Sequence, residues 1–140
     1  MDPISIAASA ITVAALAAST CRTFSKLRSL YKSLPDHFHA LNNEVADTEI
    51  VLAQLATVFS KRTSLIDEAG QKLTLELLGQ ARVALSQLQD TLKGLAESCT
   101  RSQFVLIRAW RKEQRKLGKL QGDIKRVKCT LGIMLGASNS

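Results

Sequence analysis

The sequence predicts an all-α protein, an antiparallel four-helix bundle with a long N-terminal helix. Helix-favouring residues fill the 140-residue chain, whereas aromatic residues make up 4% and prolines number two. Apolar residues recur at alternating spacings of three and four along three stretches. The breaks between the stretches are short, which favours helices packed within one chain over a coiled coil between chains. A chain of this length can bury a core without disulfides or metals.

The first expected helix runs from Pro3 to the break before Pro35. Asp2 can cap this helix, and Pro3 suits its first position because the missing N–H costs nothing there. The first half, ISIAASAITVAAL, carries Ala, Ser and Ile on every side, which predicts burial on most faces. The second half is amphipathic, with apolar residues at Phe24, Leu27, Tyr31 and Leu34.

A second helix is expected after the stretch SLPD, in which Ser33 and Asp36 form a candidate capping pair. Its apolar residues keep an unbroken spacing of three and four, which predicts one buried face. They are Phe38, Leu41, Val45, Thr48, Leu52, Leu55 and Phe59.

Two further helices follow the stretch KRTSLIDEAG, where Thr63 or Ser64 is a candidate cap and Gly70 a candidate breaker. The expected buried face of the third helix is Leu78, Ala81, Leu85, Leu88, Leu92, Leu95 and Cys99. Thr100 or Ser102 can cap the fourth helix. Its expected buried face is Leu106, Trp110, Leu117, Leu120, Ile124, Val127, Leu131 and Met134. Residues 1–136 therefore form one domain, and residues 137–140 are expected to fray.

The sequence contains few residues that could form a catalytic or metal-binding site. Cys21, Cys99 and Cys129 lie far apart, which indicates free thiols in a reducing compartment rather than a disulfide framework or a zinc site. His37 and His39 point to different faces of a helix and cannot share a metal. Glu44, Asp47 and Glu49 read as a solvated helix face. Without a phosphate-binding loop or a nucleophile motif, we expect no enzyme, no metal and no cofactor.

The apolar opening segment could be a secretion signal, a membrane span or a buried helix. A signal needs positive charge before its apolar run, and the one early charge is Asp2. As a span, the segment is marginal, since its strongly apolar residues together contribute about −1.5 to −3 kcal/mol on the insertion scale. These residues are Ile4, Ile6, Ile11, Val13 and Leu16. We therefore expect a buried helix that is just apolar enough to enter a bilayer when triggered.

The net charge of +7 comes from the last part of the chain. Residues 1–100 carry nine Lys or Arg against ten Asp or Glu, whereas residues 101–128 carry ten against two. With the apolar face of the fourth helix turned inward, we expect a cationic face on its outer side. We define the cationic face as Arg108, Arg111, Lys112, Arg115, Lys119, Lys125 and Arg126. Mixed charges would serve solubility equally well, so this bias points to a partner such as anionic lipid.

Several segments together resemble a known family. They are MDPIS at the N-terminus, LPDHFHALNNEVADTEIVLAQL in the second helix, and the ending W-R-K … L-x-x-L … I-K-R-V-K-C-T-L-G-I-M-L. The chain resembles, over essentially its whole length, the HeLo-like N-terminal domain of fungal STAND proteins, which are NLR-like immune and incompatibility receptors. That domain is related to HeLo and to the helical bundle of the mixed-lineage kinase-like pseudokinase.

The resemblance implies a non-enzymatic effector or signalling domain that oligomerises and targets membranes in regulated cell death. The helix acting on the membrane would be Ile4 to Leu16. The implied partners are anionic membrane lipid, further copies of the chain and other helical domains, and the implied location is the cytoplasm with conditional membrane association. The alternatives are a passive oligomerisation or adaptor module and a basic nucleic-acid-binding bundle. Nucleic acid is disfavoured because Trp110, the nearest aromatic residue, is expected to face the core.

Overall fold

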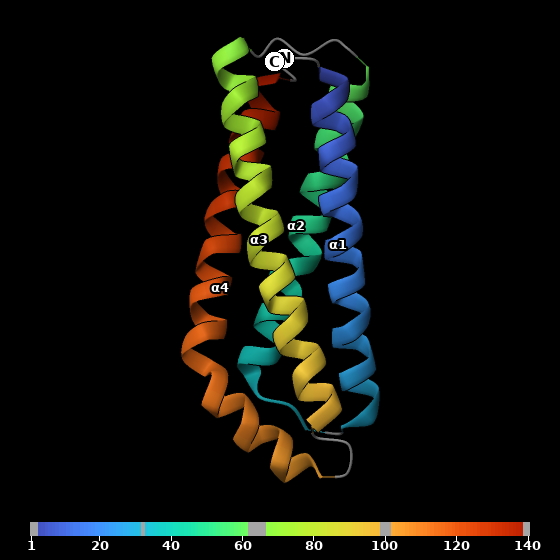
Figure 1. Ribbon diagram of the computed structural model, residues 1–140, viewed down its shortest axis with the longest axis vertical. Helices are drawn as coiled ribbons and strands as arrows, with labels where there is room; N and C mark the ends of the chain where they lie inside the picture. The colour runs from blue at the N-terminus through green and yellow to red at the C-terminus, as the bar shows by residue number, and fades with distance from the viewer. Residues whose placement is uncertain (1–2, 32, 62–66, 99–101, 139–140) are drawn as a thin grey trace.

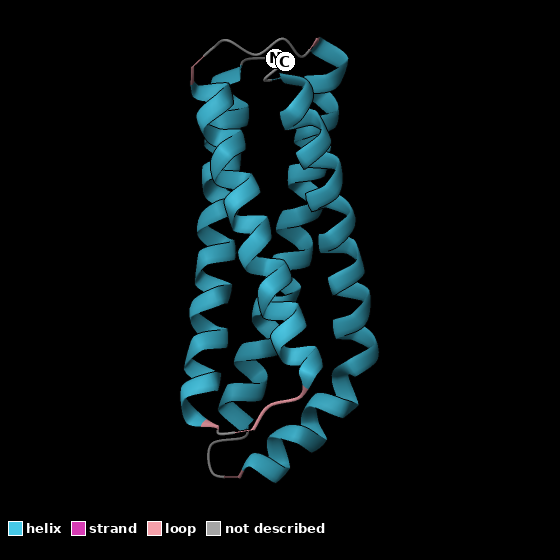
Figure 2. Ribbon diagram, turned by 180° about the vertical axis from the view of Figure 1, so that it is seen from behind, coloured by secondary structure: helices cyan, strands magenta, loops and turns pink. Residues whose placement is uncertain are grey.

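Four helices run side by side in the computed structural model, and consecutive helices are antiparallel (Figure 1). The structure describes residues 3–31, 33–61, 67–98 and 102–138. The helices are α1 (Pro3–Leu30), α2 (Asp36–Ser60), α3 (Glu68–Ser98) and α4 (Gln103–Ser138). Figure 2 shows helices joined by loops, with no strand among these residues. The predicted fold class is confirmed.

Helices α2 and α3 follow each other in the sequence but are not neighbours in the bundle. Helix α1 packs against α2 and α3, and α4 packs against the same two helices. Within the described ranges, no Cα atom of α2 lies within 8 Å of one in α3, and the same holds for α1 and α4, so these pairs are diagonally opposite. As a result α1 and α3 are parallel neighbours, as are α2 and α4 (Figure 1). The apolar spacing of a sequence predicts which face of a helix points inward but not which helices are its neighbours, so this arrangement does not follow from the sequence.

The core consists of the apolar faces expected from the sequence. Every residue named for the second helix is buried, as are those named for the third helix from Leu78 to Leu95. On α4 the face is buried from Leu106 to Leu131, whereas Met134 is half-buried and Leu135 is buried beside it. Cys99 lies outside the described residues.

Four buried polar side chains are satisfied without water. The hydroxyls of Thr20, Thr48 and Thr74 each donate to the carbonyl four residues earlier, at 2.7 to 2.8 Å. The Gln89 amide on α3 donates to the Ser19 hydroxyl at 3.0 Å and accepts from the Thr23 hydroxyl at 3.3 Å. Gln89 therefore links the parallel pair α1 and α3 through polar groups inside the bundle.

Several predicted boundaries are wrong. Helix α1 ends at Leu30, four residues before the expected stop, and α2 begins after Pro35 without a side-chain capping bond from Ser33 or Asp36. Gly70 does not break a helix. It lies in the first turn of α3, where its N–H donates to the Asp67 carboxylate at 2.8 Å. Asp67 is thus a cap that the sequence analysis missed.

Some of the remaining boundary predictions are confirmed, and others concern residues that lie outside the described ranges. Pro3 begins α1 as expected, and the Ser102 hydroxyl accepts from the Val105 N–H at 3.5 Å. Helix α4 is described as far as Ser138, and the expected fraying of residues 137–140 stays a prediction. The candidate caps Asp2, Thr63, Ser64 and Thr100 lie outside the described residues.

The first turns of α4 run obliquely across one end of the bundle (Figures 1 and 2). We call this the lower end; α1 and α3 end there, and α2 and α4 begin there. Trp110 fixes the oblique segment, because its ring lies 5.4 Å from the Phe38 ring and 5.8 Å from the His37 ring. The Gln103 amide also donates to the Ser33 carbonyl at 2.8 Å. The opposite, upper end is where α1 begins and α4 ends.

Candidate functional site

The cationic face lies on the outer side of α4. Arg108, Arg111, Lys112, Arg115, Lys119, Lys125 and Arg126 are all exposed. Their exposure follows from the inner face of the helix, since Trp110, Leu117, Leu120 and Ile124 point into the core. The prediction that these seven side chains face solvent is confirmed.

One basic residue of this region was missed by the sequence analysis. Lys116 is exposed and lines a groove of about 800 Å³ between α3 and α4, together with Lys119 and Arg126. The wall on α3 includes the exposed Val83 and Gly79. The exposure of Lys116 could be predicted from the sequence, because a lysine next to a buried leucine can extend its long side chain to solvent.

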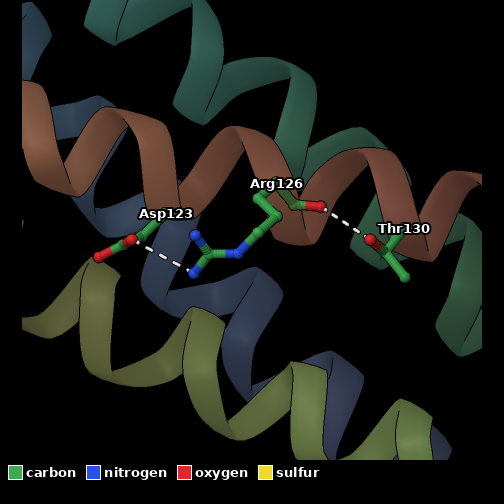
Figure 3. Close-up of polar contacts among 3 residues, drawn as sticks. All are labelled: Asp123, Arg126 and Thr130. Carbon is green, nitrogen blue, oxygen red and sulfur yellow. Dashed lines mark hydrogen bonds and ion pairs between the residues drawn. The ribbon is translucent and has the colours of Figure 1, made fainter.

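Few acidic groups offset the cationic face. The Arg126 guanidinium contacts the Asp123 carboxylate at 3.2 Å, one helical turn away, and the Arg126 carbonyl accepts from the Thr130 hydroxyl at 3.0 Å (Figure 3). The Arg126 side chain is 65% exposed, so this pair contributes little to stability. Glu113 is the other acid on this stretch. The face therefore keeps a strong positive charge.

The sequence predicts that Glu44 belongs to a solvated acidic face, and this prediction is wrong. Its side chain is 13% exposed and its Oε1 lies 2.8 Å from Nζ of Lys128 on the parallel neighbour α4. Asp47 is exposed and lies 4.0 Å from the same ammonium group. The Lys128 ammonium donates to the Glu44 carboxylate, which raises the pKa of Lys128, and partial burial opposes this shift. Lys128 thus joins α4 to α2 and is not free to bind a partner.

The N-terminal half of α1 is buried on one side and exposed on the other. Of the five residues expected to insert into a membrane, Ile6 and Val13 are fully buried, Leu16 is half-buried and Ile11 is 59% exposed. The side chain of Ile4 lies outside the described residues. The expected burial on most faces is wrong, because α1 occupies a corner of the bundle and contacts two neighbours.

The exposed side of this segment carries no charge. It presents Ser5, Ala8, Ile11, Thr12 and Ala15. Helix α1 is long and apolar enough to cross a membrane, with a mean hydropathy of 1.3 and 33% burial over its most apolar window. Core helices and signal sequences share these properties, so this composition is weak support for a span.

A shallow groove of small side chains lies between α1 and α2. Its volume is about 310 Å³, and its walls are Ile11, Ala14, Ala53, Ala56, Thr57 and Ser60. The outer surface of α2 beside α1 is thus uncharged as well.

The two histidines lie in different surroundings. The Nε2 atom of His37 lies 2.9 Å from Oε1 of Gln121, whereas His39 is exposed and lies against the Phe38 ring. In the part of the chain that the structure describes, no three His, Cys, Asp or Glu side chains gather as metal ligands.

Two of the three cysteines are described, and both are free thiols. Burial raises the pKa of the Cys21 thiol; the Glu49 carboxylate adds to this rise and Arg22 opposes it. Cys21 is therefore a poor nucleophile at neutral pH. Cys129 is exposed on α4.

Comparison of the chain with known protein families, curated proteins and solved structures finds no match. The site is therefore interpreted from its own residues.

Proposed function

We propose that the chain is a non-enzymatic effector or signalling domain of an NLR-like receptor, one that oligomerises and targets anionic membranes in regulated cell death. It resides in the cytoplasm and associates with membranes conditionally. The resemblance to HeLo-like domains supports the biological setting, and the surfaces of α1 and α4 support the physical mechanism.

The uncharged outer side of α1 carries this proposal. A surface helix of a soluble protein normally presents charged residues to water. Here no charge occurs on α1 before Arg22. The exposed residues of this segment are all uncharged: Ser5, Ala8, Ile11, Thr12 and Ala15. No charged group therefore opposes the transfer of this side of the helix from water to hydrocarbon.

The same segment makes few large contacts with the bundle. Before Thr20, Ile6 and Val13 are its fully buried large side chains among the described residues, and the other buried positions are Ala7, Ala10 and Ala17. An alanine methyl contributes far less to burial than a leucine or phenylalanine side chain. The C-terminal half of α1, with Phe24 and Leu27 buried and Tyr31 buried directly after it, is held more firmly. Release of the N-terminal half therefore disrupts the smaller part of the core.

The cationic face supplies the attraction to an anionic surface. A Lys or Arg near such a surface contributes about 1 kcal/mol, and the attraction is screened over about 8 Å at physiological ionic strength. The face thus brings the bundle to the bilayer, and α1 supplies the apolar segment.

The test is binding to vesicles of phosphatidylserine and phosphatidylcholine. Reversal of Arg108, Arg111 and Lys112 to Glu should weaken binding at least hundredfold, because three favourable charges become repulsive. The matched control reverses three exposed residues elsewhere, Lys61, Lys72 and Arg82, which changes the net charge equally.

Three outcomes would count against this proposal. Equal loss in both triple variants would mean that net charge rather than the cationic face governs binding. Tighter binding to duplex DNA than to anionic vesicles at the same salt concentration would support a nucleic-acid-binding bundle. Binding to neither, with self-association retained, would support an adaptor.

A further inference from the structure

The lower end of the bundle exposes large apolar side chains from two helices. Leu30, the last residue of α1, is 60% exposed, and Phe104 and Val105 in the first turn of α4 are 69% and 46% exposed. The bond from Gln103 to the Ser33 carbonyl holds the start of α4 against the connection that follows Leu30. Two segments far apart in the sequence thus present apolar groups at one end.

The oblique first turns of α4 explain why Phe104 and Val105 face outward. Leu106 and Trp110 of the same segment are buried, and Trp110 packs on Phe38. One side of the segment therefore packs against the bundle. Phe104 and Val105 lie on the other side of the segment and point away from the bundle. Exposed apolar groups that a rigid segment presents together indicate an interaction surface rather than incidental exposure.

Basic side chains surround these apolar groups. Over residues 22–30, 36–40, 93–97 and 103–112, which form the lower end, seven Lys or Arg stand against Asp36 and Glu97. The Arg108 guanidinium lies 5.3 Å from the centre of the Phe104 ring. An aromatic ring with aliphatic neighbours and a basic surround is the composition of surfaces that lie in the headgroup region of anionic bilayers.

The upper end differs in charge. Leu73 and Ile133 are exposed on α3 and α4 towards that end, with exposed fractions of 45% and 74%. The nearby charged residues from Lys61 and from Asp67 to Glu76 include three acids against two lysines, and α4 carries no charge after Lys128. An anionic bilayer would therefore attract the lower end and not the upper end.

We propose that the lower end, through Leu30, Phe104 and Val105 and their basic surround, is the surface that docks the bundle on an anionic bilayer. This inference rests on the proposed membrane function and adds an orientation to it. Helix α1 has 28 residues and so spans about 42 Å, which places its first turns far from the docked surface. Docking and insertion of α1 are therefore separate steps, and a docked bundle keeps the segment from Ile4 to Leu16 away from the lipid.

The experiment introduces a second tryptophan at single exposed sites of the full chain. Phe104→Trp reports the lower end, Ile133→Trp the upper end and Ile11→Trp the N-terminal half of α1, while the buried Trp110 is a constant background. Each variant is mixed with phosphatidylserine vesicles that contain brominated lipid, which quenches tryptophan at the membrane. Circular dichroism checks that each variant is folded.

We expect strong quenching of Phe104→Trp and no added quenching of the other two variants. In a companion measurement, Phe104→Ala should weaken vesicle binding about tenfold, whereas Ile133→Ala should change it less than twofold. Vesicle binding with quenching at position 133 or 11 and none at 104 would overturn the docking orientation and leave the proposed function standing. Absence of binding to any vesicle would overturn both. Loss of self-association instead of lipid binding in Phe104→Ala would assign the lower end to a second copy of the chain.

Discussion

Replacement of Lys128 by Met tests how much the ion pair with Glu44 stabilises the bundle. The two side chains are 21% and 13% exposed, and their charged atoms are 2.8 Å apart. Removing one partner of a fully buried pair costs about 3 to 5 kcal/mol, whereas an exposed pair is worth about 0.2 to 1 kcal/mol. Since this pair lies between those limits, we expect Lys128→Met to lower the free energy of unfolding by about 1 to 3 kcal/mol in urea denaturation.

Arg126→Met is the matched control, because Arg126 is 65% exposed and pairs with Asp123 on the same helix. It should change the free energy of unfolding by less than about 0.5 kcal/mol. The double variant Glu44→Gln, Lys128→Met should recover part of the loss, because no buried charge is then left unpaired. A Lys128→Met variant no less stable than Arg126→Met would refute this reasoning.

The raised pKa of Lys128 gives the same pair a pH dependence. A group whose pKa is higher in the folded state stabilises the fold fully below its unfolded value, which is about 10.4 for lysine. The stability difference between the native chain and Lys128→Met should therefore stay constant from neutral pH to about pH 9. It should fall as the pH rises through the folded pKa of Lys128.

Three other substitutions test the fold by thermal and urea unfolding. Leu88→Ala, at a fully buried site, should cost about 2 to 5 kcal/mol, and an equal cost for Leu73→Ala, which is 45% exposed, would contradict the assigned core. Gly118→Ala should stabilise α4 by about 0.5 to 1 kcal/mol, because an added Cβ meets no atom within 4 Å; destabilisation would show a contact at this surface. Asp67→Ala should cost about 0.5 to 2 kcal/mol through loss of the cap on Gly70, and no change would mean that the bond contributes nothing.

The sequence predicts most of the core because the inner face of a helix depends on local spacing. The seven residues from Phe38 to Phe59 are buried for that reason, and the outward cationic face follows once Trp110 and Leu117 point inward. Gly70 does not act as the predicted helix breaker, because a single glycine in a helix costs only about 1 kcal/mol. The Asp67 cap and the packing of α3 offset this cost.

Features that depend on which helices are neighbours could not be predicted. The pairing of Glu44 with Lys128 requires α2 and α4 to be adjacent, which they are because α2 and α3 lie diagonally opposite each other. The exposed side of α1 has a different origin, since any helix of a four-helix bundle has two neighbours and cannot bury all its faces. The exposure of Phe104 results from the oblique start of α4, which no apolar spacing specifies.

Leakage from anionic vesicles tests the proposed membrane function most directly. The full chain is fused to a trimeric coiled coil so that it is oligomeric, and dye release is measured for the native sequence, for Ala15→Arg and for Ser25→Arg. Both positions are exposed on α1, but only position 15 lies in the apolar segment, where an Arg opposes insertion; the cost at the centre of a span is about 2.5 to 3.5 kcal/mol. We predict leakage with the native sequence and Ser25→Arg and its loss with Ala15→Arg, while circular dichroism and self-association stay unchanged. An oligomeric native chain that releases no dye, or an Ala15→Arg variant that releases as much, would contradict membrane insertion by α1.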